Sequence, residues 1–432
     1  MAGLLRICTA GSVDDGKSTL IGRLLYDSQA IYDDQVHSVK IASKHRTAGP
    51  VDFSLFTDGL RAEREQGITI DVAYRYFSTA RRKFILADTP GHQQYTRNMA
   101  TGASTADLAV LLVDARYGVL EQSRRHTQIA LLLGISHYVV AVNKMDLVDF
   151  NREIFDSISN DFSELLQGSN VHTIPISALK GDNVTTQSER TPWYEGPSLL
   201  TYLETIEVNE DLTAKPFRFP IQLVLRPSHD FRGYAGQIES GVIRCGDTVT
   251  LSPSGATTTV VKIVTYDGEL EEAHAPMAVT LVLSDALDIS RGDMLSIGTT
   301  NVGKCFDANI VWMDQRPSDP KRIYLLKHTT RMVRSEIDCS LSLNDIGQAT
   351  ISTSQPLFFD QYRDNRSTGS FILIDPATNF TSGAGMINGV QHDVGVMERD
   401  NIALQLAKLA RAAESDDAAA QAMRKALDKL LS

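Results

Sequence analysis

Gly11–Thr19 reads GSVDDGKST, and this stretch decides how the first half of the chain is interpreted. It follows the apolar run LLRICT (residues 4–9) and precedes apolar residues at helical spacing from Leu20 to Leu25. Glycines let the backbone curl so that several N–H groups point at one anion, and the positive end of the following helix adds to the field. The stretch therefore predicts a phosphate-binding loop between a strand and a helix. The residues expected to hold the phosphates are Gly11, Ser12, Val13, Asp14, Asp15, Gly16, Lys17, Ser18 and Thr19.

The same loop predicts a magnesium site. Lys17 is expected to reach the β and γ phosphates, and the Ser18 hydroxyl to bind Mg²⁺. Asp88 follows the short apolar run 84–87 and is expected to hold the ion through a water molecule. Thr69, within GITID, is expected to complete the magnesium shell while the γ-phosphate is present.

The turn that begins at Asp88 reads DTPGH. Thr89, Pro90 and Gly91 are predicted to contact the nucleotide, and the Gly91 N–H is expected to face the γ-phosphate. His92 is the candidate catalytic residue, because a side chain beside that phosphate can position the attacking water. The other histidines show no metal-ligand spacing and are interpreted as structural.

Asn143, Lys144, Met145 and Asp146 form the second decisive motif, NKMD, directly after the apolar run 138–142. A carboxylate at Asp146 can accept from both guanine N1–H and the exocyclic amine, a pair of donors that adenine does not present. Asn143 is expected to brace the phosphate loop, and the Lys144 stem to cover one face of the base. The motif predicts GTP and GDP as the bound nucleotides.

A third loop is expected to close the other edge of the base. It consists of Ser177, Ala178 and Leu179, after another strand-like run. With the motifs in this order, the residues favour GTP binding and hydrolysis. A phosphotransferase such as a P-loop kinase remains an alternative, against which NKMD weighs.

Composition limits the remaining classes. The 432-residue chain is 42% hydrophobic with a net charge of -11, which argues against broad electrostatic binding to nucleic acid or anionic membranes. Its four cysteines show no metal-binding or disulfide-rich spacing and predict buried, reduced thiols. No segment has the length of a membrane span, so a cytoplasmic protein is expected.

Pattern divides the chain into four parts. Residues 1–212 alternate strand-like and helical runs, which predicts an α/β GTPase domain with a mostly parallel sheet. Residues 213–305 and 306–400 are rich in β-branched runs and turn glycines, which predicts two small antiparallel β-barrels. Residues 401–432 have helical spacing and are expected to form a helical tail or linker.

The motifs GSVDDGKST, EREQGITID, DTPGHQQYTRNMATGAS, NKMD and SALKGDN together resemble the translation-factor class of GTPases. Elongation factor Tu and its relatives usually have histidines at the positions of Ser12 and Asp15. In this departure the chain resembles, more narrowly, the GTPase subunit of bacterial ATP sulfurylase. Residues 365–375 and 379–386 carry a similar resemblance in the last barrel.

The resemblance implies an elongation-factor-like architecture and a regulatory role. In that family, GTP hydrolysis drives formation of adenosine 5′-phosphosulfate and diphosphate from ATP and sulfate, the first step of sulfate assimilation, on a separate catalytic subunit. The expected partners are that subunit, in a heterodimer or higher assembly, and an adenylylsulfate kinase, fused or separate. Nucleic acid and membrane partners are not expected. The alternative is a translation-factor GTPase that carries aminoacyl-tRNA, which would need a basic groove on the barrels.

Overall fold

The computed structural model describes residues 3–28, 37, 39, 43, 51–56, 71–92, 95–208, 211–228 and 231–390. The chain divides into two compact units. Unit 1 comprises Met1–Asp211 with Val311–Arg316 and Leu341–Ile346, and unit 2 comprises the rest from Leu212 onwards. The predicted Thr69 and the predicted tail 401–432 lie outside the described residues.

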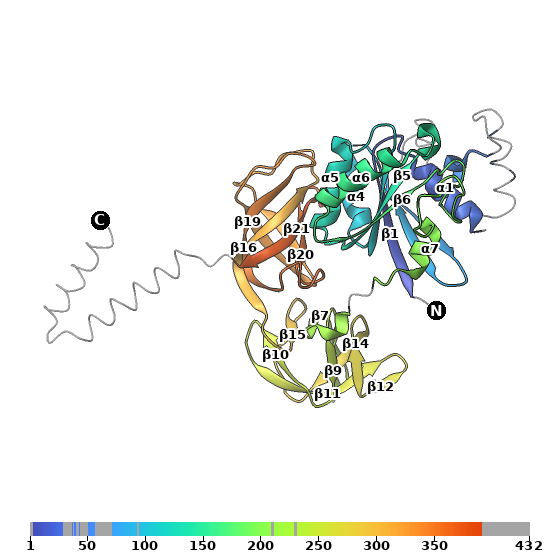
Figure 1. Cartoon of the computed structure of the whole chain (residues 1–432). Coiled ribbons are helices and arrows are strands. Elements are labelled where there is room, and N and C mark those ends of the chain that lie inside the picture. Colours follow the sequence, from blue (N-terminus) through green and yellow to red (C-terminus); the bar gives the residue numbers. More distant parts are fainter. Residues whose placement is uncertain are drawn as a thin grey trace, which may run out of the picture. The chain divides into compact units, whose positions relative to one another are not determined.

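Unit 1, in which Figure 1 labels β1, β5 and β6, is built on a six-stranded sheet with the order β2-β3-β1-β4-β5-β6. The pairs β3–β1, β1–β4, β4–β5 and β5–β6 are parallel, and the edge strand β2 is antiparallel to β3. The strands are β1 (Leu4–Ala10), β2 (Ala73–Ser78), β3 (Lys83–Asp88), β4 (Leu108–Asp114), β5 (His137–Asn143) and β6 (Asn170–Pro175).

Helices pack on this sheet because its central strands are apolar on both faces. Every residue of β4 is buried, and all of β5 except its first residue. The described α-helices are α1 (Lys17–Asp27), α4 (Thr96–Ala103), α5 (Glu121–Leu132), α6 (Arg152–Leu165) and α7 (Leu199–Thr205). Short 3-10 helices are η1 (Phe53–Phe56), η3 (Met145–Val148) and, at the start of unit 2, η4 (Leu212–Ala214).

Unit 2 contains two β-barrels. In the first, a seven-stranded antiparallel sheet has the order β10-β15-β7-β8-β14-β11-β12, and an extra β10–β11 pairing closes it. A two-stranded ribbon, β13-β9, accompanies it. The strands are β7 (Arg218–Ser228), β8 (Phe231–Gln237), β9 (Val242–Arg244), β10 (Thr248–Ser252), β11 (Thr257–Thr265), β12 (Gly268–Leu270), β13 (Glu272–His274), β14 (Ala278–Leu283) and β15 (Met294–Ser296).

The second barrel is closed, with the order β16-β19-β18-β17-β20-β21. The pairs β19–β18, β18–β17, β17–β20 and β20–β21 are antiparallel. The strands are β16 (Asn301–Trp312), β17 (Tyr324–His328), β18 (Arg331–Ile337), β19 (Ile346–Phe359), β20 (Ser370–Ile374) and β21 (Thr381–Val390).

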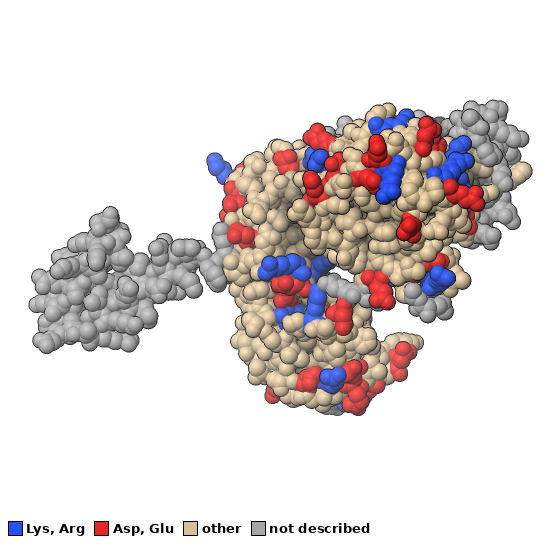
Figure 2. All heavy atoms as spheres, in the orientation of Figure 1, with Lys and Arg blue, Asp and Glu red and all other residues tan. Residues whose placement is uncertain are grey.

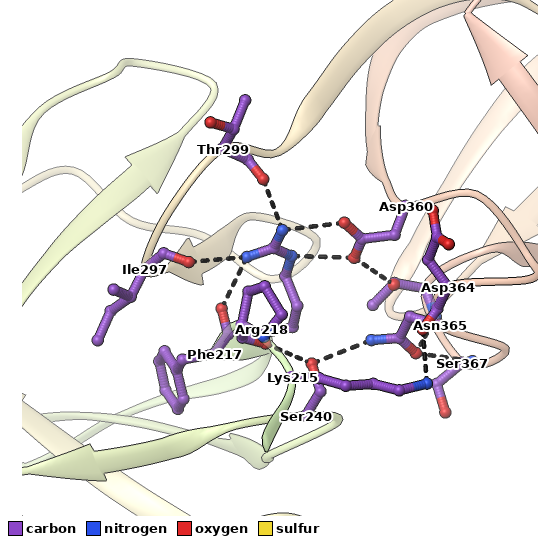
Figure 3. Close-up of polar contacts among 12 residues, drawn as sticks. Lys215, Phe217, Arg218, Ser240, Ile297, Thr299, Asp360, Asp364, Asn365 and Ser367 are labelled. Atoms are coloured by element: carbon purple, nitrogen blue, oxygen red, sulfur yellow. Dashed lines mark hydrogen bonds and ion pairs between the residues drawn. The ribbon is translucent and has the colours of Figure 1, made fainter. Parts of the chain in front are cut away.

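A buried arginine joins the two barrels within unit 2 (Figure 3). Arg218, at the start of β7, is 2% exposed, and its Nε and Nη2 donate to the two carboxylate oxygens of Asp360, both at 2.9 Å. The guanidinium also donates to the carbonyls of Phe217, Ile297 and Thr299 at 3.0, 3.0 and 2.6 Å. The planar fork of arginine matches a carboxylate in this way, so a charge that would be costly to bury is fully hydrogen-bonded.

The predicted fold class, an α/β GTPase domain followed by antiparallel β-barrels, is confirmed. The boundaries proposed near residues 212, 305 and 400 stay predictions. All four cysteines are free thiols; Cys8 is buried as expected, whereas the other three are only half-buried. Among the described helices, none is long and apolar enough to cross a bilayer.

Candidate nucleotide-binding site

Four predicted motifs meet at one edge of the sheet in unit 1. Gly11–Thr19 follows β1, Asp88 ends β3, Asn143 ends β5, and Ser177–Leu179 comes shortly after β6. Because these strands are parallel, their carboxyl ends lie at the same edge, where open α/β sheets bind ligands. The strand order places β1 between β3 and β4, so the phosphate loop lies at the switch point of the sheet.

The phosphate loop has the backbone shape that its sequence predicts. Gly16 and Asp14 adopt positive φ angles of 93° and 67°, and α1 begins directly after Gly16. The Ser12 N–H donates to Asp15 Oδ2 at 2.5 Å, inside the loop. Lys17 Nζ donates to the carbonyls of Gly11 and Ser12 at 2.9 and 2.8 Å. The Lys17 side chain therefore folds back over the phosphate loop, where it is also predicted to bind the phosphates.

The donors of this loop fit a phosphate chain. Ser12 Oγ is buried and has no hydrogen-bond partner within the described part of the chain. Burial lowers the pKa of the Lys17 ammonium, and the carboxylates of Asp88, Asp15 and Asp14 act in the opposite direction. Burial also raises the pKa of Asp15, against the effect of Lys17. A buried cation, an unpaired hydroxyl and the N-terminus of α1 are the groups that an anionic ligand would satisfy.

The turn after β3 packs against the phosphate loop. A Cβ atom added to Gly91 would lie 2.9 Å from the Gly11 carbonyl oxygen and clash with Lys17 Nζ, so only glycine fits there. Thr89 is fully buried and its hydroxyl donates to the Thr9 carbonyl at 2.5 Å. His92 is half-buried, with its ring edge-on to Tyr95 at a centroid distance of 6.1 Å. The turn thus places Gly91 against the phosphate loop and the Asp88 carboxylate within electrostatic reach of Lys17.

Asn143 connects three loops of the site. Its Nδ2 donates to the Asp15 carbonyl at 2.7 Å, and its Oδ1 accepts from the Ala178 N–H at 2.9 Å. A Cβ atom added to Gly16 would clash with the same Nδ2, so a glycine at this position allows Asn143 to approach the phosphate loop closely. The side chain of Asn143 therefore ties the phosphate loop to the loop after β6.

The other residues that are predicted to surround the guanine base lie close to Asn143 in the chain or in the loop after β6. Lys144 has a φ of 61° and its Nζ donates to the Asp14 carbonyl at 2.5 Å. Met145 is fully buried, whereas Asp146 is half-buried. In the loop after β6, Ser177 is buried and its Oγ accepts from the Lys180 N–H at 3.2 Å.

One charged residue of the site was missed by the sequence analysis. Asp114 ends β4 and lies 2.9 Å from Lys144 Nζ, and it accepts a hydrogen bond of 2.6 Å from Arg116. Burial raises the pKa of Asp114, but the hydrogen bonds from Arg116 and Lys144 outweigh burial and lower it to about 2. The sequence does carry a signal for this residue, because Asp114 is an aspartate at the carboxyl end of an apolar run.

Not every predicted residue is brought into contact. Ser18 and Thr19 lie in the first turn of α1 and are half-buried, while Val13 and Leu179 are 41% and 49% exposed. No group of three or more His, Cys, Asp or Glu side chains in the described ranges is arranged to hold a metal ion. Mg²⁺ is commonly bound through one or two protein groups with phosphates and waters, and the assignment of Ser18 and Asp88 to this ion stays a prediction.

Fold and site define a GTP-binding protein of the translation-factor class. Residues 3–216 match the family model of the elongation factor Tu GTP binding domain, and residues 338–388 match a GTP-eEF1A C-terminal domain-like model. The expectation of a guanine-nucleotide-binding GTPase domain is therefore confirmed.

Curated relatives narrow this class. The chain is 53% identical to sulfate adenylyltransferase subunit 1 of Bacteroides thetaiotaomicron, over 89% of the chain and 86% of that protein. It is 54% identical to the same subunit of Bacteroides fragilis, with the same coverage of both chains. It is also 53% identical to the bifunctional enzyme CysN/CysC of Mycobacterium tuberculosis, over 90% of the chain and 67% of that protein. The chain belongs to the sulfate adenylyltransferase subunit 1 family.

Proposed function

We propose that this chain is the regulatory GTPase subunit of an ATP sulfurylase. It binds and hydrolyses GTP and couples that hydrolysis to formation of adenosine 5′-phosphosulfate and diphosphate from ATP and sulfate on a separate catalytic subunit. The observation that carries the proposal is 53% identity to a sulfate adenylyltransferase subunit 1 along 89% of the chain. The relative is called subunit 1, which supports a second subunit as the partner.

The phosphate loop binds the triphosphate in this proposal. Lys17 exchanges its bonds to the Gly11 and Ser12 carbonyls for bonds to the β and γ phosphates. Ser18 and Thr69, with Asp88 through water, would hold Mg²⁺, which would supply positive charge against the phosphate oxygens. Asp146 accepts from guanine.

His92 positions the attacking water. The water oxygen forms a bond to the γ-phosphorus while the bond from that phosphorus to the β–γ bridging oxygen breaks, which releases GDP and inorganic phosphate. The Gly91 N–H, held against the phosphate loop by its close packing, donates to the γ-phosphate. This hydrolysis changes the contacts made by the turn that begins at Asp88.

Coupling requires that the partner distinguishes the two nucleotide states. A ligand shifts an equilibrium only by its difference in affinity for the two states, and the shift is reciprocal. The catalytic subunit must therefore bind the GTP form with a different affinity from the GDP form. The segments around Thr69 and His92 are the parts of this chain that sense the γ-phosphate.

Surface charge favours a protein partner over aminoacyl-tRNA. On the face drawn in Figure 2, the Lys and Arg side chains of the described residues are interspersed with Asp and Glu. A carrier of aminoacyl-tRNA would need a continuous basic groove. We further propose an adenylylsulfate kinase as an associated partner, because one relative of this chain is called a bifunctional enzyme.

The decisive experiment isolates the complex from the native host. The chain should co-elute with a second protein, and the complex should form adenosine 5′-phosphosulfate from ATP and sulfate faster with GTP than with a non-hydrolysable GTP analogue. If the GTP-loaded chain retains aminoacyl-tRNA and leaves sulfate adenylation unchanged, the proposal is wrong. Transfer of radiolabelled γ-phosphate to a small acceptor, instead of release as inorganic phosphate, would favour a phosphotransferase.

A further inference from the structure

At one corner of the sheet in unit 1, beyond the end of α4, the described residues leave part of one face exposed. Alternate side chains of a strand point to opposite faces, and residues paired in register share a face. Tyr76 pairs with Ile85, and Ile85 pairs with Arg6, so these three form a row across β2, β3 and β1. The opposite face of the same strands is buried: Phe77 and Phe84 stack there at 4.6 Å.

Ile85, in the middle of this row, lies on the floor of an open groove of about 250 Å³. The end of α4 and the turn after it form one wall, and two tyrosines of β2 form the other. Tyr74 is 41% exposed and Tyr76 is 68% exposed. The lining residues of this tyrosine groove are Arg6, Ile7, Tyr74, Tyr76, Ile85, Ala87, Gly102, Thr105 and Ala106.

The groove lies beside the antiparallel edge strand β2, where a sheet can leave one face uncovered. Tyrosine and arginine are also the residue types that are enriched at the energetic centres of protein interfaces. Tyr74, Tyr76 and Arg6 bring these types together beside an apolar floor.

The charges at the groove select an acidic occupant. The Arg6 guanidinium and the Lys83 ammonium make no ion pair or side-chain hydrogen bond with any described residue. Lys83 pairs with Leu4 and with Ser78, so it lies on the same face as Arg6, one row away. Both cations belong to a chain whose net charge is -11. Asp107, next to Ala106 of the groove, accepts from the Arg6 main-chain N–H at 2.8 Å, so the two cations and this carboxylate leave a net charge of about +1, which fits an acidic partner surface.

The strands and helix that frame the groove lead directly to the nucleotide. β2 begins at Ala73, just after the segment that contains Thr69, and β3 ends at Asp88. α4 begins at Thr96, shortly after His92, and a Cβ atom at Gly102 of α4 would clash with the Thr89 side chain. A protein seated in the groove would thus contact the strands and the helix that adjoin the segments predicted to sense the γ-phosphate.

We propose that the tyrosine groove is the docking site for an acidic segment of the separate catalytic subunit. An apolar side chain of that segment fills the space between Tyr74 and Ala106, and a neighbouring carboxylate pairs with Arg6. This inference rests on the proposed function, because it assigns to that partner a surface on this chain. It gives the partner a physical route to distinguish GTP from GDP.

Two variants of the full chain test the groove. Tyr76→Ala removes an exposed ring, and Arg6→Glu reverses the charge that selects the carboxylate. Each should weaken binding of the catalytic subunit by roughly 10- to 100-fold, the usual range for a central interface residue. GTP affinity and hydrolysis by the isolated chain should stay unchanged. Tyr266→Ala, at a fully exposed tyrosine in unit 2, is the matched control and should bind the partner normally.

The outcomes separate the two proposals. If the unmodified chain binds no sulfate-adenylating subunit, the proposed function fails and the groove proposal fails with it. If the unmodified chain binds its partner and both variants bind equally well, only the groove proposal is overturned. If Arg6→Glu does not fold, the affinity of Tyr76→Ala decides.

A photo-cross-linking amino acid in place of Tyr76 provides an independent readout. In the GTP-loaded complex it should link to a partner peptide that contains Asp or Glu, identified by mass spectrometry. A cross-link to the β-barrels of the same chain would overturn the proposal, because the groove would then be covered internally.

Discussion

The side-chain amide of Asn143 donates to the main-chain carbonyl of Asp15 at 2.7 Å and thereby joins the guanine-reading motif to the phosphate loop. The same side chain accepts from Ala178, so one residue holds three loops in register. Lys144 adds a second link from the same motif, because its Nζ donates to the Asp14 carbonyl, but only Asn143 also binds Ala178. Nucleotide affinity should therefore depend on a residue that is not predicted to touch the phosphates.

Asn143→Ala should weaken binding of both GTP and GDP by roughly 30-fold, since two hydrogen bonds of about 1 kcal/mol each are lost. Titration with fluorescent guanine nucleotides measures the change. Asn365→Ala is the matched control, because Asn365 is also a buried, hydrogen-bonded asparagine but lies in unit 2. Equal effects of the two substitutions would contradict the bracing role of Asn143.

Arg218→Met should destabilise unit 2 strongly. The substitution leaves the half-buried Asp360 carboxylate without its bidentate partner, and removing one member of a buried pair costs about 3–5 kcal/mol. Urea unfolding followed by circular dichroism measures this loss, while guanine nucleotide affinity should not change. The double variant Arg218→Met/Asp360→Leu should recover part of the stability, since no unpaired charge remains. A double variant as unstable as Arg218→Met would show that the pair itself is not the cause.

The sequence predicted the nucleotide loops because each is a short string at the end of an apolar run. A strand, a turn glycine such as Gly16 and a helix start follow one another within a few residues, and the carboxyl ends of parallel strands must share an edge. Gly91 was placed next to the phosphate by the same reasoning, and the structure packs it against Gly11. The role of each residue with bound GTP stays a prediction, and Thr69 lies outside the described residues.

Long-range pairings could not be predicted. Arg218 and Asp360 are 142 residues apart in the chain, and nothing in either local pattern distinguishes them from solvated surface charges. Asp114 is different, because it ends an apolar strand at the ligand edge and could have been proposed from its position. Its partner Lys144 was assigned only to the base, and the ion pair between them depends on the adjacency of β4 and β5.

A buried histidine should make the stability of unit 1 dependent on pH. His126 on α5 is 1% exposed; burial, with the positive charges of Lys17 and Arg125, lowers its pKa to about 3. The unfolded chain takes up this proton near the ordinary pKa of about 6.5, whereas the folded chain does so only near 3. Stability is therefore fully present above about pH 6.5 and falls as the pH is lowered toward 3.

At pH 5 the His126 contribution should be a loss of about 2 kcal/mol relative to pH 7.5, from 1.36 kcal/mol per pKa unit. His126→Gln, which cannot titrate, should lose less stability than the unmodified chain over this range. Urea unfolding at both pH values gives the two differences. A His126→Gln effect that is the same at pH 7.5 and pH 5 would contradict the neutral, buried state of this histidine.

His92→Ala should retain GTP binding while hydrolysis slows by roughly 10²- to 10⁴-fold, the usual contribution of a positioned proton-handling group. Single-turnover release of inorganic phosphate measures the rate separately from binding. His172→Ala is the control, because His172 stacks on Tyr202 at 4.4 Å within the same unit, away from the predicted γ-phosphate position. Unchanged hydrolysis in the His92 variant would remove that residue from the mechanism.

Asp146→Asn should change the base that the site prefers. The carboxylate accepts from guanine N1–H and the exocyclic amine, whereas the new amide would place a donor opposite an amine donor and lose that pairing. Xanthine has a carbonyl oxygen in place of the amine, so the amide can donate to it, and the variant should bind xanthosine triphosphate more tightly than GTP. Competition between the two nucleotides measures the shift, with Asp156→Asn on the exposed surface of α6 as the control. Persistent guanine selectivity would mean that a group other than Asp146 reads the base, and the Asp114–Lys144 pair would be the next site to substitute.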